Sequence, residues 1–182
     1  MSAREKLLNA AAQLAATEGV QGLSVERVIT AAAVSKGAFF YHFETKEQMI
    51  GALVDHVSSV RMAEVDAATK AGKSFADTLL KMIETELLEG GQLTGVCVAA
   101  VLLNPSLRES LTARRTDWRQ RLIEEDGFTS ERAEQLLLTI DGALIGTMLY
   151  DAASRSARAT NSTKLMRSIV ADQRLCIESE KF

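Results

Sequence analysis

The sequence of 182 residues has a single proline, two cysteines, two histidines and two tyrosines. So few prolines and tyrosines argue against a β-rich or disordered chain. The two cysteines, Cys97 and Cys176, lie far apart and without the spacing of a metal site. We therefore expect buried, reduced thiols, and the sequence gives no support for a redox-sensing role.

Long apolar runs are also missing. The longest uninterrupted one, Val96–Leu103, is far shorter than the roughly 18 residues that span a bilayer. The N-terminus lacks the apolar core of a signal peptide, so we expect a soluble, cytoplasmic protein. Hydrophobic residues make up 47% of the chain and charged residues 25%, which is enough apolar surface for a globular core.

An excess of positive charge is absent too, because the net charge is −3. The first 47 residues are balanced, with Arg4, Lys6, Arg27, Lys36 and Lys46 against Glu5, Glu18, Glu26, Glu44 and Glu47. Binding to nucleic acid through bulk charge alone is therefore a poor fit, and any such binding must depend on individually placed residues.

Catalytic motifs are not found either. The sequence shows no nucleophile elbow, phosphate loop, metal-ligand set or carboxylate pair in a suitable context. We expect no enzyme activity, no cofactor and no metal. His56 stands alone on a long predicted helix, which favours a structural or solvent-facing role over metal ligation.

What the chain does have is apolar residues at helical spacing, which predict an all-α fold of about nine helices. Serines at 24, 35 and 74 are good N-caps, and glycines at 19, 72 and 127 are good helix stops. The predicted helices cover roughly residues 2–19, 24–33, 35–43, 45–71, 74–89, 94–103, 105–126, 130–153 and 163–178. Residues 154–162 are small and polar, and they predict a loop; in the helix after it, Leu165, Ile169 and Cys176 should face inward.

The first three helices are short, and only a few residues separate the second from the third, which is helix-turn-helix geometry. We therefore predict a helix-turn-helix DNA-binding domain over residues 1–47. A helical ligand-binding and dimerisation domain should follow over residues 48–182.

The third predicted helix divides into two faces. Phe39 and Phe43 are four residues apart and should anchor it to the first two helices. The other face is small and polar. Gly37 and Ala38 allow the backbone to approach the floor of a major groove, while Lys36, Tyr41 and His42 can donate hydrogen bonds to DNA.

This segment resembles the DNA-binding head of the TetR family of repressors over about residues 5–55. The resemblance rests on Gly22-Leu23-Ser24, on Val34-Ser35-Lys36-Gly37 and on Phe40-Tyr41-His42-Phe43 followed by Lys46. It implies a two-domain, all-helical homodimer that binds a palindromic operator. It also implies that an unknown small-molecule effector binds in the C-terminal domain, the body, and moves the two DNA-binding heads out of register with successive major grooves. It further implies DNA contacts at Ser24, Ser35, Lys36, Gly37, Ala38, Tyr41, His42 and Lys46.

The chain departs from the family pattern after the cap of the second helix. Val25 and Glu26 stand where a threonine and a basic residue are frequent, and Phe40 replaces a frequent tyrosine. Arg27 is a further candidate DNA contact that either compensates for this loss or pairs with Glu26 or Glu18. The departures leave one alternative open, a helical interaction protein that retained the head without binding DNA.

The body offers weaker signals. The resemblance implies a dimer interface made by the helices at 130–153 and 163–178, with candidates Leu137, Gly142, Ala143, Gly146 and Ile169. The small residues permit close approach of a helix, although packing within one subunit explains them as well. Candidate ligand-binding residues, which can equally be plain core, are Met62, Phe75, Met82, Cys97, Trp118 and Met148. Arg114, Arg115, Arg119 and Arg121 predict either a site for an anionic effector or a solvated face.

Overall fold

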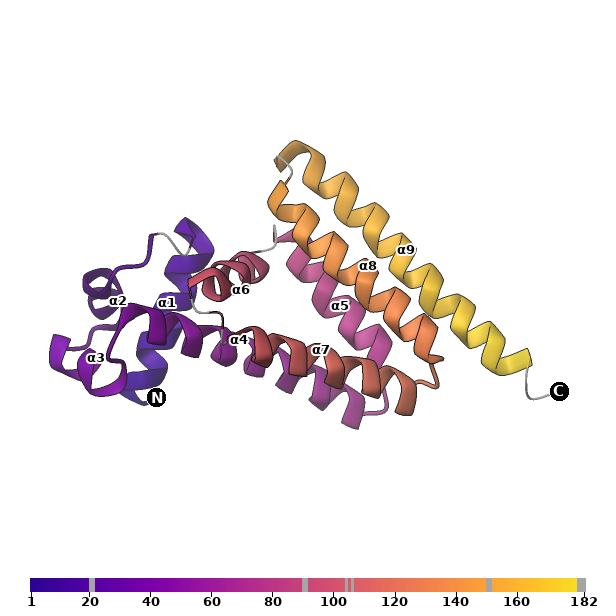
Figure 1. The fold of residues 1–182 in the computed structure, drawn as a ribbon, viewed down its shortest axis with the longest axis horizontal. Helices are drawn as coiled ribbons and strands as arrows, with labels where there is room; N and C mark the ends of the chain where they lie inside the picture. The colour runs from indigo at the N-terminus through magenta and orange to yellow at the C-terminus, as the bar shows by residue number, and fades with distance from the viewer. Residues whose placement is uncertain (20–21, 90–91, 104, 106, 150–151, 180–182) are drawn as a thin grey trace. The chain divides into compact units, whose positions relative to one another are not determined.

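The computed structural model describes the chain apart from residues 20–21, 90–91, 104, 106, 150–151 and 180–182. Regular structure in the described residues is entirely helical, which confirms the predicted fold class (Figure 1). The described helices are α1 (Ala3–Glu18), α2 (Val25–Ala32), α3 (Lys36–His42), α4 (Lys46–Lys70), α5 (Phe75–Leu88), α6 (Gln92–Leu103), α7 (Leu107–Glu124), α8 (Ser130–Leu149) and α9 (Ala152–Ser179).

Helix boundaries follow local signals in the sequence. Ser2 and Glu5 form a capping box that begins α1, in which each side chain bonds to the backbone N–H of the other residue. Gly19, Gly72 and Gly127 follow α1, α4 and α7 with φ of 74°, 84° and 70°. This left-handed half of the φ range favours glycine, and it explains why these helices end where the sequence predicts.

The helices divide into two compact units. The first combines residues Met1–Arg61 with Gln92–Arg108, and the second combines Met62–Gly91 with Glu109–Phe182. In the first unit α1 packs against α2, α3 and α6. Its core is made of fully buried side chains from α1, α3 and α4, among them Leu7, Leu8, Phe39, Met49, Ile50 and Leu53.

The second unit is built on α5, α8 and α9, which pack side by side (Figure 1). Phe75 at the start of α5 is fully buried in this core, and the Arg121 guanidinium carbon lies 4.1 Å from the centre of its ring. Asp126 accepts hydrogen bonds from the backbone N–H of Ala76 at 2.5 Å and of Phe75 at 3.3 Å. The turn after α7 is thereby joined to the N-terminus of α5.

The loop predicted over residues 154–162 is wrong, because α9 already begins at Ala152. Ala159 is buried in the core of the second unit. The Thr160 hydroxyl donates to the carbonyl of Ser156 at 3.0 Å, which satisfies a polar side chain within the helix. Tertiary burial therefore overrides the weak helix propensity of this serine- and threonine-rich stretch.

The predicted inward face of α9 is correct for Ile169 and wrong for Leu165 and Cys176, which are exposed. The buried positions Ala159, Thr163, Met166, Val170 and Gln173 recur at alternating spacings of four and three, and Ile169 is buried beside Val170. Leu165 and Cys176 fall outside that register. Cys97 on α6 is half-buried, so the expectation of two buried thiols does not hold.

Candidate nucleic-acid interface

A tight turn links α2 to α3. Ala33, directly after α2, has φ 52° and ψ 47°, a left-handed conformation that reverses the chain. The N–H of Val34 donates to the carbonyl of Ile29 at 3.1 Å and closes the end of α2. Ser35 then caps the N-terminus of α3, so only three residues lie between the two helices. This is the predicted helix-turn-helix.

Phenylalanines fix α3 to the first unit. Phe39 and Phe43 are buried, with ring centres 5.7 Å apart. The Arg4 guanidinium carbon, on α1, lies 5.6 Å from the centre of the Phe43 ring. The predicted inward face of the third helix is therefore confirmed, while Phe40 between them remains 48% exposed.

The opposite face of α3 is open to solvent. Tyr41 is 84% exposed, and Lys36 and Gly37 are exposed as well. Ala38 and His42 are half-buried, and the His42 ring lies edge-on to the Tyr41 ring at 5.0 Å. Small and hydrogen-bonding side chains thus lie on the exposed face of this short helix, while its aromatic face packs against the core of the first unit.

Two serines on this surface act as helix caps. The Ser24 hydroxyl accepts from the N–H of Arg27 at 3.2 Å, and the Ser35 hydroxyl accepts from the N–H of Ala38 at 3.1 Å. A hydroxyl that accepts one bond retains a hydrogen to donate. Both serines can therefore cap a helix and donate to a phosphate. Lys46 is the first residue of α4 and is half-buried.

Arg27 is in an ion pair. Its two terminal nitrogens donate to the two carboxylate oxygens of Glu18, and Nη1 also donates to the carbonyl of Gly22 at 3.2 Å. Of the two acidic partners that the sequence suggests, the structure selects Glu18. The Arg27 guanidinium lowers the pKa of Glu18, and the carboxylate raises the pKa of Arg27.

His56 has a structural contact. Its Nε2 lies 2.9 Å from Oδ1 of Asn9, and the contact joins α4 to α1 within the first unit. In the described residues no cluster of three or more histidine, cysteine or acidic side chains is arranged to hold a metal ion. No described helix combines the length and the apolarity needed to cross a membrane.

Five of the six ligand-binding candidates lie in the second unit. Phe75 is buried in its core, and Met62, Met82 and Trp118 are half-buried against it. The indole Nε1 of Trp118 lies 3.2 Å from the sulfur of Met62. Cys97 belongs to the first unit, and the side chain of Met148 lies outside the described residues.

Three of the four clustered arginines are engaged in ion pairs. Arg115 bonds Glu134 at 3.0 Å and Asp141 at 2.8 Å, and Arg121 bonds Asp66 and Glu125, both at 2.7 Å. Arg119 donates to the Ser130 hydroxyl and lies 3.8 Å from Glu134. These neighbouring carboxylates favour the solvated-face interpretation over an anion site.

The interface candidates divide by burial. Leu137 and Ile169 are buried in the core of their own subunit. Ala143 and Gly146 are half-buried, and Gly142 is exposed with no atom within 4 Å of where its Cβ would lie. Gly142 therefore leaves open space on the surface of α8 within this subunit.

An exposed apolar stripe runs along the same side of α8. Leu138, Ile145 and Leu149 are exposed, and with Gly142 they follow spacings of four, three and four. This stripe was not predicted from the sequence. The sequence does contain a signal for it, because the stripe residues fall on a different face of the helix from the buried Leu136, Leu137 and Ile140.

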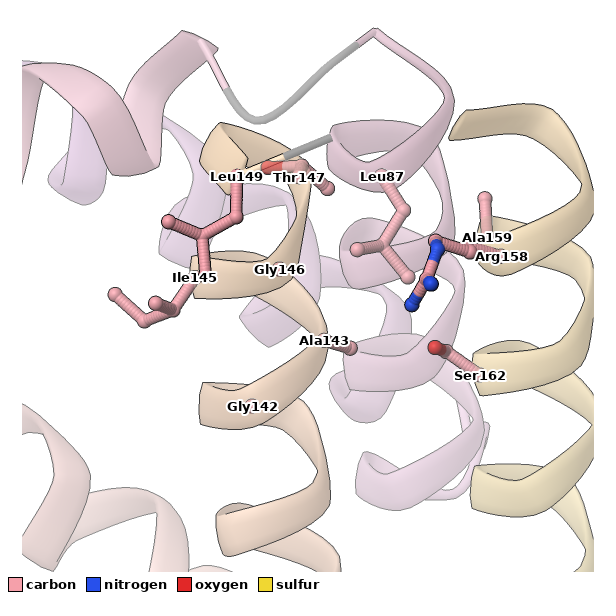
Figure 2. A pocket seen from close by; sticks show the side chains of 10 residues that line it. All are labelled: Leu87, Gly142, Ala143, Ile145, Gly146, Thr147, Leu149, Arg158, Ala159 and Ser162. Carbon is pink, nitrogen blue, oxygen red and sulfur yellow. The ribbon is translucent and has the colours of Figure 1, made fainter. Parts of the chain in front are cut away.

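The stripe borders an open cleft of about 240 Å³ between α5, α8 and α9. Figure 2 shows Leu87 from α5 and Ala143 from α8 in the cleft, with Arg158 and Ser162 on the α9 side. Its described lining contains none of the five ligand-binding candidates whose side chains are described.

Comparison with known proteins gives a consistent result. Residues 7–53 match the model of bacterial regulatory proteins, tetR family. The HTH-type transcriptional regulator LmrA of Bacillus subtilis is 23% identical over 175 residues, which cover 90% of each chain. The HTH-type transcriptional repressor Rv3405c of Mycobacterium tuberculosis is 30% identical over 86 residues, which cover 46% of each chain.

Solved structures share the fold. A transcriptional regulator from Rhodococcus sp. Rha1 superposes with a TM-score of 0.71 at 23% identity, covering 94% of this chain and 97% of that one. The multidrug binding protein EbrR, in complex with imidazole, gives 0.66 at 20% identity and covers 93% of this chain and 95% of its own. Residues 7–53 therefore resemble the tetR family of bacterial regulatory proteins, and the chain is similar to HTH-type transcriptional regulators over 90% of its length.

Proposed function

We propose that this protein is a ligand-responsive repressor that binds a palindromic operator as a homodimer in the cytoplasm. The observation that carries the proposal is the division of α3, with Phe39 and Phe43 buried and Tyr41 and Lys36 in solvent. A recognition helix needs both faces, because it must be rigidly supported and still present donors to DNA. Residues 1–47 supply the DNA-binding domain, and residues 48–182 supply ligand binding and dimerisation.

The proposed DNA contacts come from α3 and its flanks. Lys36 provides a positive charge and Tyr41 a hydroxyl for phosphate oxygens. Gly37 and Ala38 allow close approach to the groove, where the Ala38 methyl can meet a thymine methyl. The remaining proposed contacts are Ser24, Ser35, His42 and Lys46.

The dimer is proposed to form through α8 and α9. The exposed stripe of Leu138, Ile145 and Leu149 is apolar, and a soluble subunit gains by burying such a surface. Gly142 within the stripe, with Ala143 and Gly146 beside it, allows a partner helix to approach closely. Pairing two helices from each subunit gives a four-helix bundle. Leu137 and Ile169 lie in the core of the subunit and hold α8 and α9 together behind the interface.

The effector is proposed to bind in the second unit. The half-buried side chains of Met62, Met82 and Trp118 offer an apolar and polarisable surface beside the buried Phe75. A structure with the same fold is named a multidrug binding protein, which supports an apolar organic effector. Binding there would lower operator affinity by changing the separation of the two heads.

The test of DNA recognition uses the duplex that the wild-type protein selects from a random-sequence pool. Lys36→Ala and Tyr41→Ala should each weaken binding by about 1–3 kcal/mol. Lys36→Ala should also reduce the slope of log affinity against log salt by about one. Tyr41→Phe isolates the hydroxyl, and Lys81→Ala at an exposed position of α5 is a matched control that should change neither quantity.

Helix content and dimer mass are measured on every variant by circular dichroism and light scattering. If Lys36→Ala and Tyr41→Ala both retain wild-type affinity while folding normally, α3 is not the recognition helix.

A further inference from the structure

The end of α1 and the first turn of α2 are joined by one side-chain pair. Glu18 is the last residue of α1, and Arg27 is the third residue of α2. Both carboxylate oxygens of Glu18 accept hydrogen bonds from the two terminal nitrogens of Arg27. The guanidinium is therefore held by a two-pronged contact, which fixes its direction better than a single bond does.

The loop between the helices contributes a third contact to the same guanidinium. Nη1 of Arg27 donates to the carbonyl of Gly22 at 3.2 Å. A Cβ at Gly22 would lie 2.9 Å from Cβ of Glu18 and 3.2 Å from its Oε2. The absence of a side chain at Gly22 thus lets this residue pack against the ion pair.

Arg27 is nevertheless placed beside the proposed DNA surface. Its backbone N–H donates to the hydroxyl of Ser24, one of the proposed DNA contacts, at 3.2 Å. The Arg27 side chain is 45% exposed and that of Glu18 is 40% exposed, so a polyanion can reach both. Arg27 is the only basic residue on α2, and the acidic Glu26 precedes it.

Because the Arg27 guanidinium lowers the pKa of Glu18, the carboxylate is ionised at neutral pH and cancels the charge of Arg27. A phosphate would have to displace a carboxylate that already occupies both prongs of the guanidinium. Since counterion release depends on cations that neutralise phosphates, a cation already neutralised contributes nothing to it.

We propose that Glu18 withholds Arg27 from the operator, so that this acidic residue limits the number of phosphates that the head contacts. Glu18 is a positioning residue that acts through Arg27 and does not touch DNA itself. The inference rests on the proposed DNA surface of the head.

The experiment measures affinity for the selected duplex as a function of salt concentration, with full-length protein. Glu18→Gln should raise the affinity at low salt and steepen the slope of log affinity against log salt by about 0.9, which corresponds to one new phosphate contact. Arg27→Gln alone should leave the slope at the wild-type value. The double variant Glu18→Gln/Arg27→Gln should lose the gain.

Glu26→Gln is the matched control, because it removes one exposed acid from α2 beside Arg27 and gives the same change in net charge. It should not reproduce the steeper slope. A slope that falls by about 0.9 in Arg27→Gln means that Arg27 already contacts a phosphate, and it overturns the proposal. An unchanged slope in Glu18→Gln, or an equal increase in Glu26→Gln, overturns it as well.

Failure of this inference is distinguishable from failure of the proposed interface. Lys36→Ala, measured in the same series, reports on the recognition helix independently of Arg27. Thermal unfolding of each variant measures any loss of stability. The Glu18 and Arg27 variants should show the same decrease in the unfolding midpoint, because each removes one partner of the same ion pair. Among the single variants at Glu18, Glu26 and Arg27, only Glu18→Gln should change the slope.

Discussion

Nε2 of His56 lies 2.9 Å from Oδ1 of Asn9, and this pair connects the long helix α4 to α1. An amide oxygen only accepts hydrogen bonds, so Nε2 of His56 carries the proton. We expect Asn9→Ala to lower the free energy of unfolding by about 1 kcal/mol, because the half-buried imidazole loses its partner. Urea unfolding followed by far-ultraviolet circular dichroism measures this, with Asn161→Ala at an exposed position of α9 as the control for the change in helix propensity.

The two adjacent phenylalanines of α3 should respond differently to truncation. Phe39 is fully buried, so Phe39→Ala should cost about 3–5 kcal/mol through the lost burial and the cavity left behind. Phe40 is 48% exposed, and Phe40→Ala should cost much less. Chemical denaturation of both variants checks the difference. Equal losses would contradict the assignment of Phe39 as the anchor.

Ala33 offers a stabilising substitution. A residue with a side chain at φ 52° pays a steric penalty of about 1–2 kcal/mol, which glycine avoids. Ala33→Gly should therefore raise the midpoint of thermal unfolding. Ala31→Gly, at an exposed position inside α2, should lower stability by about 1 kcal/mol, because glycine is unfavourable within a helix. Two identical substitutions, two residues apart, should thus have opposite signs.

The surface of α8 predicts the effect of a large side chain on assembly. At Gly142 a Cβ meets nothing within 4 Å, so the subunit itself should accept Gly142→Leu. A partner helix packed against that glycine should not, and the dimer should dissociate. Gly146→Leu should have the same effect. Light scattering measures the mass, with Ala113→Leu at an exposed position of α7 as the control. A dimeric Gly142→Leu variant with normal helix content would show that the interface lies elsewhere.

The Arg115–Glu134 pair predicts a pH dependence. Hydrogen bonding to Arg115 holds the pKa of Glu134 below its ordinary value of 4.5. A depressed folded-state pKa stabilises the fold above the unfolded-state value, and that contribution disappears as the pH falls through the folded-state value. The stability difference between wild type and Glu134→Gln should be constant near neutral pH and shrink in acid below pH 4.5. Urea unfolding across this range measures it, and a difference that grows in acid would contradict the ion pair.

Features set by neighbours in the sequence were predictable, and features set by distant packing were not. Ser24, Ser35 and Gly72 mark helix ends through local hydrogen bonds or backbone freedom, so they could be read directly. The aromatic face of α3 followed from the spacing of Phe39 and Phe43. These signals lie within one or two helical turns.

The first turns of α9 illustrate the opposite case, because Ala159 owes its helical environment to burial in the core of the second unit. Likewise, Glu18 and Glu26 were equally plausible partners for Arg27 until the end of α1 was placed beside the first turn of α2. Partner choice of this kind depends on how α1 and α2 pack against each other.

Residues 92–108 cluster with the first unit, and α6 packs against α1, although this stretch lies between α5 and the rest of α7 along the chain. An excised fragment that stops at Arg61 would leave the α6-facing surface of α1 bare. Hybrid regulators made by grafting this head onto another protein's body need to transplant 92–108 together with 1–61. Recombination between relatives at a single crossover after α4 would separate two segments that pack as one body.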